Sequence, residues 1–334
     1  MNAPNVTIVT IMKDEGPFIL EWIAWNQMIG VTDFIVMTND CSDGTDLMLD
    51  RLHELGHLTH LPNPIVVTKD GSPHGVALKY AQHLAPYRAA DWILHTDVDE
   101  FLCLAPDVPD IPALIDACGE VDAISISETL FGCSGVDTFV DAPIVTQFTH
   151  AMRQDPKEGE ARRGVKTLFR NEDIWRGRHN HRPVVRKNRL NTIRWADGSG
   201  APAPEDFVKG KEPGMDCDGR YNLAALHHYS VRSLDSFLAK LHRGDAVKSK
   251  RTRAGAYWRK RNQNTVRNEA ALTRVPELQK RIDALKADAA LNHLHEQAVA
   301  THQDRIAQMR KDPEMAEIIA YMSQYLWGHP DFAK

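Results

Sequence analysis

Three acidic residues stand together at the end of a short apolar run, and they are well placed to do chemistry. Asp97, Asp99 and Glu100 follow the run Trp92–Leu94, which no Gly or Pro interrupts. If the strand continues into them, alternation places Asp97 and Asp99 on the same side. Neighbouring carboxylates repel each other, and a hard divalent cation such as Mg²⁺ or Mn²⁺ would remove that cost. The alternative is a solvated, inert turn.

Two further polar clusters follow earlier apolar runs, at 6–12 and 33–37. The clusters consist of Lys13, Asp14, Glu15, Asn39, Asp40 and Asp43. In open, mostly parallel sheets, ligands bind beyond the carboxyl ends of the strands. All three clusters would meet at that edge, so the pattern predicts one binding site built from three strand ends.

The elements that must position these clusters are alternating strands and amphipathic helices. Strands are expected over 5–12, 33–37, around 65–67, over 92–94 and over 121–127, and helices over 18–29, 46–54 and 76–89. This alternation predicts an α/β fold with a mostly parallel sheet flanked by helices. A helical pattern returns from 276 to 325. We therefore expect a domain over 1–245 and a helical C-terminal extension over 246–334.

Composition is that of an ordinary globular protein, with 43% hydrophobic and 25% charged residues over 334 positions. The five cysteines are widely spaced and form no Cys-x-x-Cys pair, which argues against a disulfide framework and a zinc knuckle. The sequence shows no signal-peptide pattern and no apolar stretch long enough to span a bilayer. These features predict a cytoplasmic protein, and peripheral association with the inner face of the membrane stays open.

A basic segment extends from Arg153 to Arg194 and contains Lys166 and Arg182. Phosphate binding is one interpretation of such a density of cations, and a solvated surface is the other. Upstream, Gly132 and Gly135 enclose two small residues. These glycines predict either a loop whose backbone approaches a ligand closely or a simple turn between strands.

Some patterns point elsewhere and are set aside. His53-Glu54-Leu55-Gly56-His57 matches a zinc-protease motif, but that chemistry needs both histidines on one continuing helix, and Gly56 should end the helix. The chain has no Walker loop and no Gly-x-Gly-x-x-Gly. No nucleic-acid-binding module accompanies the basic stretches, so a nucleic-acid partner is not expected.

Taken in order, the motifs resemble bacterial glycosyltransferases of the GT-A (Rossmann-like) fold, in the family-2-like group. The matching stretches are Lys13-Asp-Glu15, Asn39–Thr45, Asp91–Leu102 with its Asp-Val-Asp-Glu-Phe, Phe131–Gly135, Gly164–Arg170, and His228-Tyr229 followed by 233–244. The resemblance covers roughly residues 5–245. The order and spacing of the motifs are more specific than any one of them.

The resemblance implies a sugar transfer from a nucleoside-diphosphate sugar, foremost a UDP-sugar, to a saccharide acceptor in cell-surface or extracellular polysaccharide synthesis. Inversion at the sugar carbon is expected. A Mn²⁺ or Mg²⁺ ion would be held by Asp97, Asp99 and His228. The donor would be bound by Lys13, Asp14, Glu15, Asp40, Asp43, Asp97, Lys166 and Arg182.

An inverting transfer also needs a base, because an acceptor hydroxyl has a pKa far above 7. Glu128 is the expected base and Asp137 the reserve. Two other functions stay open on the sequence. One is non-catalytic binding of sugar nucleotides or anionic polysaccharide, and the other is a nucleotidyltransferase, which would release pyrophosphate.

Overall fold

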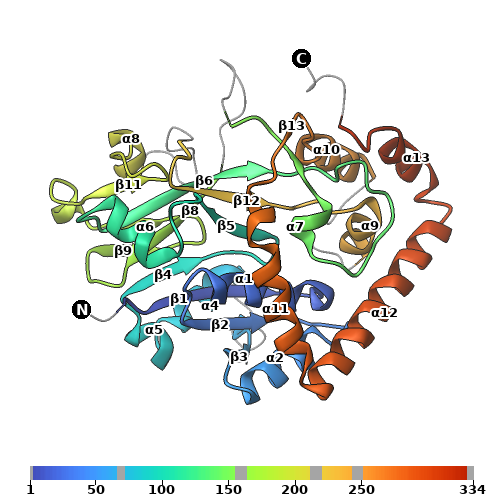
Figure 1. The fold of residues 1–334 in the computed structure, drawn as a ribbon, viewed down its shortest axis with the longest axis horizontal. Coiled ribbons are helices and arrows are strands. Elements are labelled where there is room, and N and C mark those ends of the chain that lie inside the picture. The colour runs from blue at the N-terminus through green and yellow to red at the C-terminus, as the bar shows by residue number, and fades with distance from the viewer. Residues whose placement is uncertain (1–2, 66–71, 155–163, 211–219, 243–250, 329–334) are drawn as a thin grey trace.

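The structure is a computed structural model that describes residues 3–65, 72–154, 164–210, 220–242 and 251–328. A nine-stranded sheet forms its centre, in the order β3-β2-β1-β4-β8-β6-β12-β5, with β11 beside β6 (Figure 1). Its strands are β1 (Val6–Met12), β2 (Asp33–Thr38), β3 (Thr59–Pro62), β4 (Trp92–His95), β5 (Glu100–Leu104), β6 (Ala123–Leu130), β8 (Val165–Arg170), β11 (Trp195–Asp197) and β12 (Ala224–His228). Most pairings are parallel, and helices flank the sheet. The predicted fold class is confirmed.

The N-terminal part consists of parallel strands joined by helices, as the sequence predicted. The helices are α1 (Ile19–Met28), preceded by the 3₁₀ turn η1 (Gly16–Phe18), then α2 (Thr45–Glu54), α4 (Pro73–Ala81) and α5 (Ala85–Ala89). Two expectations were wrong in detail. The helix expected over 76–89 is broken into two, with Pro86 in the first turn of the second. The third strand is Thr59–Pro62 rather than 65–67; residues 66 and 67 lie outside the described part.

Two strands run against the others: β8 near the centre of the sheet and β5 at its edge. Strand β8 lies between β4 and β6 and runs against both, with Lys166 opposite Ile126 and Leu168 opposite Leu94. Strand β12 is parallel to β6 but antiparallel to β5, so His228 lies opposite Glu100. The start of β8 therefore meets the carboxyl ends of β4, β6 and β12 at one edge of the sheet.

Alternation along the strands divides the core into layers on the two faces of the sheet. On β1, Ile8 belongs to the cluster that includes α1, whereas Val9 belongs to the cluster that includes α4. The second cluster also holds Trp175 and Trp195. Among the described residues, no helix has the length and apolar character required to cross a membrane.

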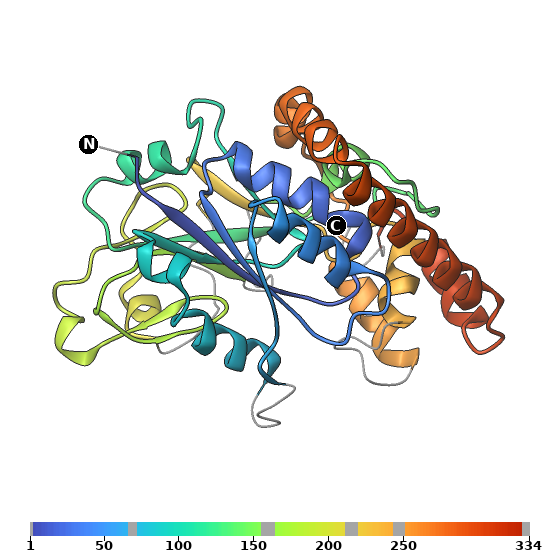
Figure 2. The ribbon, with the colours of Figure 1, turned by 90° about the horizontal axis from the view of Figure 1, so that it is seen from below.

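The C-terminal helices pack against the N-terminal layer rather than standing apart (Figure 2). They are α9 (Leu234–His242), α10 (Arg251–Arg261), α11 (Val275–Lys286), α12 (Ala289–Lys311) and α13 (Ala316–Gln324). Helix α11 lies on α1, and α12 lies on η1, α2 and α9. Ser233 precedes α9, and its hydroxyl accepts the Ser236 N–H at 3.1 Å. The division into domains at residue 245 stays a prediction.

Candidate active site

The acidic motif forms a tight turn between β4 and β5. The Glu100 N–H donates to the Asp97 carbonyl at 3.1 Å, and the indole of Trp22 donates to the same carbonyl at 3.1 Å. The Glu100 carboxylate closes the turn, because its Oε2 accepts from the Thr96 hydroxyl and the Asp97 N–H, both at 3.0 Å. The expected alternation was therefore wrong. The chain turns at Val98 instead of continuing as a strand, and the two aspartates acquire different partners.

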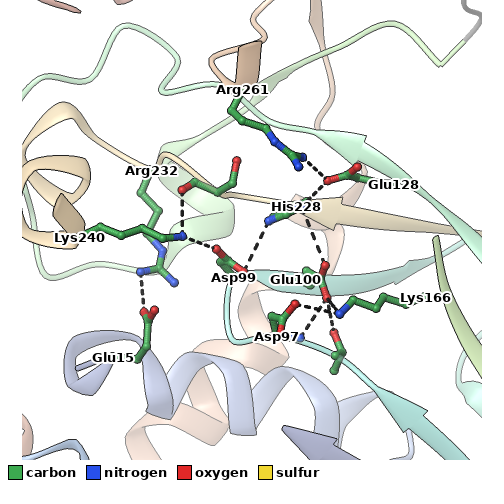
Figure 3. Close-up of polar contacts among 12 residues, drawn as sticks. Glu15, Asp97, Asp99, Glu100, Glu128, Lys166, His228, Arg232, Lys240 and Arg261 are labelled. Atoms are coloured by element: carbon green, nitrogen blue, oxygen red, sulfur yellow. Dashed lines mark hydrogen bonds and ion pairs between the residues drawn. The ribbon is translucent and has the colours of Figure 1, made fainter. Parts of the chain in front are cut away.

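Asp97 pairs with a lysine from β8. The fully buried ammonium of Lys166 lies 2.8 Å from Oδ2 of Asp97 and 3.2 Å from Oε2 of Glu100 (Figure 3). Burial alone would lower the lysine pKa, but the two carboxylates raise it above its usual value. Burial alone would likewise raise the pKa of Asp97, and the charge of Lys166 brings it well below normal. Burial raises the pKa of Glu100 to about 6 in spite of the lysine.

Asp99 faces two cations from the other side of the turn. Its Oδ1 lies 3.6 Å from Nε2 of His228 at the end of β12, and its Oδ2 lies 3.0 Å from Nζ of Lys240 on α9 (Figure 3). Lys240 also donates to the Ser230 carbonyl at 3.3 Å. Burial would raise the pKa of Asp99, but Lys240 and His228 hold it well below its usual value. Asp99 is thus ionised at neutral pH.

A second carboxylate holds the other side of the His228 ring. Oε1 of Glu128, on β6, is hydrogen-bonded to Nδ1 of His228 and lies 2.7 Å from Nη1 of Arg261 on α10. Burial would raise the pKa of Glu128, but His228 and Arg261 lower it to about 2. Burial would lower the pKa of His228, yet Asp99 and Glu128 raise it well above 6.5. His228 therefore lies between two carboxylates that orient it.

A divalent cation would meet Asp99 and His228 but not all three predicted ligands together, and it would have to displace the proton that the raised pKa keeps on the His228 ring. Within the part of the chain that the structure describes, no three His, Cys, Asp or Glu side chains form a metal-binding group. Asp97 is held by Lys166 instead. Oδ1 of Asp99 and Nε2 of His228 are too far apart for a hydrogen bond. Glu128 on Nδ1 is the kind of carboxylate support that metal-binding histidines receive.

The polar clusters after β1 and β2 lie next to each other, as predicted. Their carboxylates, however, accept hydrogen bonds from the neighbouring loop of the protein itself. Oδ1 of Asp14 accepts the Ser42 N–H at 2.7 Å, and Oδ2 of Asp43 accepts the Gly16 N–H at 3.1 Å. The Glu15 carboxylate lies 2.9 Å from Nη1 of Arg232. Asp14, Glu15 and Asp43 are all buried. The structure gives them partners within the protein, and direct contact with a donor stays a prediction for them.

Lys13 and Asp40 lie in these same loops with more accessible side chains. Lys13 is half-buried and Asp40 is exposed. Asp40 has a left-handed backbone, with φ of 42°, which aspartate tolerates better than most residues. Together with Asn39, which is also half-buried, they are the members of the two clusters that solvent, and therefore a ligand, can reach.

Two predicted site residues lie away from the acidic turn. Asp137 pairs with Arg310 of α12, at 2.5 Å. The guanidinium carbon of Arg182 lies over the rings of Trp195 and Phe207, 5.2 and 4.3 Å from their centroids. The structure thus does not bring Asp137 to Glu128 or Arg182 to Asp97. The position of these two residues in the sequence therefore did not predict which part of the protein each side chain contacts.

The glycine loop after β6 serves packing within the protein. A Cβ on Gly132 would lie 2.3 Å from the Asn264 side chain, and a Cβ on Gly135 would lie 2.5 Å from the indole of Trp327. Gly135 also has φ of +77°. The close approach predicted for these glycines is present, but the C-terminal segment makes it in place of a ligand.

The zinc-protease pattern is resolved as expected. Gly56 follows α2 with φ of +79°, so the helix does not continue to His57. His53 accepts the His60 N–H at 3.1 Å, and the His60 ring lies 2.7 Å from Asp50. These histidines hold α2 against β3.

Sequence reasoning missed three cations of this site: Lys240, Arg232 and Arg261. Lys240 and Arg232 lie within or beside the stretch after His228-Tyr229 that carried the resemblance, so that stretch could have suggested them. Arg261 lies in a basic run beyond it, and no spacing links it to Glu128. Only the packing of α10 brings it there.

The sequence matches no known family model and no curated protein. The structure aligns with crystal structures of TarS from S. aureus, at 12% identity in each case. Residues 1–349 of TarS align with a TM-score of 0.29 over 94% of this chain and 91% of that chain. The same fragment in complex with UDP aligns with a TM-score of 0.29 over 92% and 91%. TarS without that truncation aligns with a TM-score of 0.28 over 91% and 55%.

Proposed function

We propose that this chain is a glycosyltransferase that moves a sugar from a nucleoside-diphosphate donor, foremost a UDP-sugar, to a saccharide acceptor with inversion. The observation that carries the proposal is the convergence of Asp99, His228 and Lys240 beside the Asp97 turn. Carboxylate, imidazole and ammonium groups there can hold a divalent cation and a diphosphate together. The edge is also the one at which open α/β sheets bind ligands.

The donor side is assigned to the two aspartates and their cations. Asp99 and His228 would hold Mn²⁺ or Mg²⁺, which when bound supplies a Lewis acid for the departing diphosphate. The Lys240 ammonium, which pairs with Asp99 in the structure, can pair instead with a phosphate oxygen of the donor. Asp97, with about a third of its side chain exposed, can accept a hydroxyl of the ribose or the sugar. Lys166 keeps that carboxylate ionised.

Glu128 is proposed as the acceptor base. With a pKa of about 2 it is a carboxylate at every working pH, so it is always in the base form. The same shift makes it a weak base, because His228 and Arg261 both stabilise its charge. Its basicity rises when one of these cations turns to another anion, and a bound diphosphate is such an anion. Acceptor activation would then follow donor binding.

The direct test is incubation with a panel of nucleoside-diphosphate sugars and saccharide acceptors, with Mn²⁺, Mg²⁺ or chelator. We expect release of a nucleoside diphosphate that chelator abolishes and Mn²⁺ restores. Binding without turnover would indicate a non-catalytic sugar-nucleotide binder, and release of pyrophosphate would indicate a nucleotidyltransferase.

Asp99→Asn sharpens the test, since it removes a ligand charge and keeps the side-chain shape. We expect turnover to fall by about a hundredfold or more, as for loss of a charge-stabilising group in an active site. Undiminished turnover in chelator, or in Asp99→Asn, would remove the metal from the proposal.

A further inference from the structure

The long helix α12 lies directly over the loops that follow β1 and β2. It packs on η1 and α2, although more than two hundred residues separate them in sequence (Figure 2). A Cβ on Gly16 would lie 2.5 Å from the Cβ of Ala298, so only glycine allows helix and loop to meet this closely. His302, one turn further on, packs edge-on against Phe18 at 5.5 Å. Helix α12 is therefore in tight contact with the first loop of the candidate donor site.

The two loops beneath α12 are tied to each other by three neighbouring hydrogen bonds. The Ser42 N–H donates to Asp14 at 2.7 Å, the Glu15 N–H to the Thr45 hydroxyl at 2.8 Å, and the Gly16 N–H to Asp43 at 3.1 Å. Asp14 adopts a left-handed backbone, with φ of 52°. A non-glycine residue keeps that conformation only when its surroundings hold it there.

Arg305 of α12 contacts both partners of the hydrogen bond at one end of this set. Its Nη1 lies 3.3 Å from Oδ2 of Asp14, and its Nη2 donates to the Ser42 hydroxyl at 2.8 Å. One planar guanidinium thus holds a residue from each loop, which a single-point ammonium cannot reproduce. Arg305 is only 8% exposed, so little solvent competes for these contacts.

We propose that Arg305 is a positioning residue for donor binding, and that α12 is a structural part of the donor site. This inference rests on the proposed function. Arg305 orients the carboxylate of Asp14 and the backbone of Ser42, and so fixes the loops that carry Lys13 and Asp40 at the strand ends. Loss of Arg305 would take one cation away from a buried carboxylate and free the left-handed turn to relax.

The matched control is another arginine–aspartate pair that secures the same helix. Arg51 of α2 lies 2.7 Å from Asp288, which caps the start of α12, and it is more exposed than Arg305. Arg51→Ala removes a tie to α12 without touching either loop. A purely structural role for Arg305 would make the two variants alike once their stabilities are matched by adjusting temperature.

The experiment measures nucleoside-diphosphate affinity by calorimetry, donor KM and kcat by product release, and backbone hydrogen exchange, for wild type, Arg305→Ala, Arg305→Lys and Arg51→Ala. We expect Arg305→Ala to raise the dissociation constant and donor KM by about tenfold or more, with a smaller change in kcat, because the loops are displaced rather than removed. Arg305→Lys should fall between Arg305→Ala and wild type, and Arg51→Ala should stay within about twofold of wild type. The Ser42 amide should lose exchange protection only in the Arg305 variants.

Two outcomes separate this inference from the proposed function. If the wild type binds no nucleoside diphosphate, the proposed function fails and the inference fails with it. If the wild type binds one and Arg305→Ala binds it as tightly as Arg51→Ala does, with equal protection at Ser42, the inference alone is overturned. Arg305→Lys keeps the test decisive if Arg305→Ala does not fold.

Discussion

Two basic residues of one sequence segment are buried in opposite chemical surroundings. Lys166 is fully buried among the carboxylates of Asp97 and Glu100, whereas Arg182 is 2% exposed and lies over the rings of Trp195 and Phe207. The Lys166 ammonium is neutralised by ion pairs, and the planar guanidinium is accommodated by aromatic faces and the Phe207 carbonyl. A buried cation thus carries charge into a candidate site where its partners are ionised side chains, and it packs as part of the core where its partners are aromatic rings.

The neighbouring histidines repeat this contrast over two positions. His228 lies between Asp99 and Glu128, and its pKa is raised well above 6.5. The His227 ring points the other way and packs 4.6 Å from that of Phe131, and burial lowers its pKa to about 3. Alternation along β12 separates the two rings. The first is a candidate for chemistry, and the second is a core residue.

The largest effect is expected from Lys166→Met, which removes the cation and keeps most of the volume. Asp97 and Glu100 would lose their compensating charge. Breaking a buried ion pair in this way costs about 3–5 kcal/mol of unfolding free energy. Donor affinity should fall as well, because Asp97 would no longer be held ionised. Urea unfolding measures the stability, and calorimetry with a nucleotide measures the affinity. A stable variant with normal donor affinity would show that Lys166 matters neither for the fold nor for the donor site.

His228→Ala should reduce the response of turnover to Mn²⁺ far more than His227→Ala does. We expect about a 10–100-fold loss of apparent metal affinity, which is typical when a metal site loses such a group. His227→Ala should instead lower stability by leaving a cavity beside Phe131. Metal titrations of both variants are the check. Equal metal dependence in the two would exclude His228 from the site.

Glu21 is a buried carboxylate that accepts hydrogen bonds from backbone N–H groups. Burial raises its pKa to about 7, although the N–H groups of Ile144 and Val145 donate to it at 2.6 and 3.2 Å. Between pH 4.5 and 7 the folded protein retains a proton that the unfolded chain releases. Glu21 therefore lowers stability as the pH rises through that window, by about 1.4 kcal/mol per pH unit at most.

Glu21→Gln should remove this slope, because a neutral amide can still accept both N–H groups. We expect the variant to equal wild type near pH 4 and to exceed it near pH 7. Urea unfolding at several pH values provides the measurement. A variant that parallels wild type throughout would show that Glu21 does not titrate in this range.

The smallest effect is expected from Arg182→Met, which keeps apolar contact with Trp195 and Phe207. The loss of one hydrogen bond and the aromatic contact should cost about 1–2 kcal/mol of unfolding free energy. Donor affinity should stay at the wild-type value. A clear loss of donor affinity with unchanged stability would show that Arg182, like Lys166, contributes to the donor site.

The sheet and its functional edge could be predicted because their signals are local. Apolar runs and helical spacing reported which segments are strands and helices, and polar residues after β1, β2 and β4 marked the carboxyl edge. The predicted meeting is observed for the clusters after β1 and β2. The alternation of Asp97 and Asp99 could not hold, because a backbone hydrogen bond from Glu100 closes a turn at that point.

The sequence by itself determined the α/β class and the position of the acidic motif at the end of a strand. Only the tertiary structure decided the partners: Lys240 for Asp99, Arg261 for Glu128 and Arg305 for Asp14. The physical reason is that the hydrophobic pattern of a segment records which of its side chains face the core and which face solvent. That pattern is set by residues close together along the chain. Ion pairing depends on which surfaces meet after distant helices have packed.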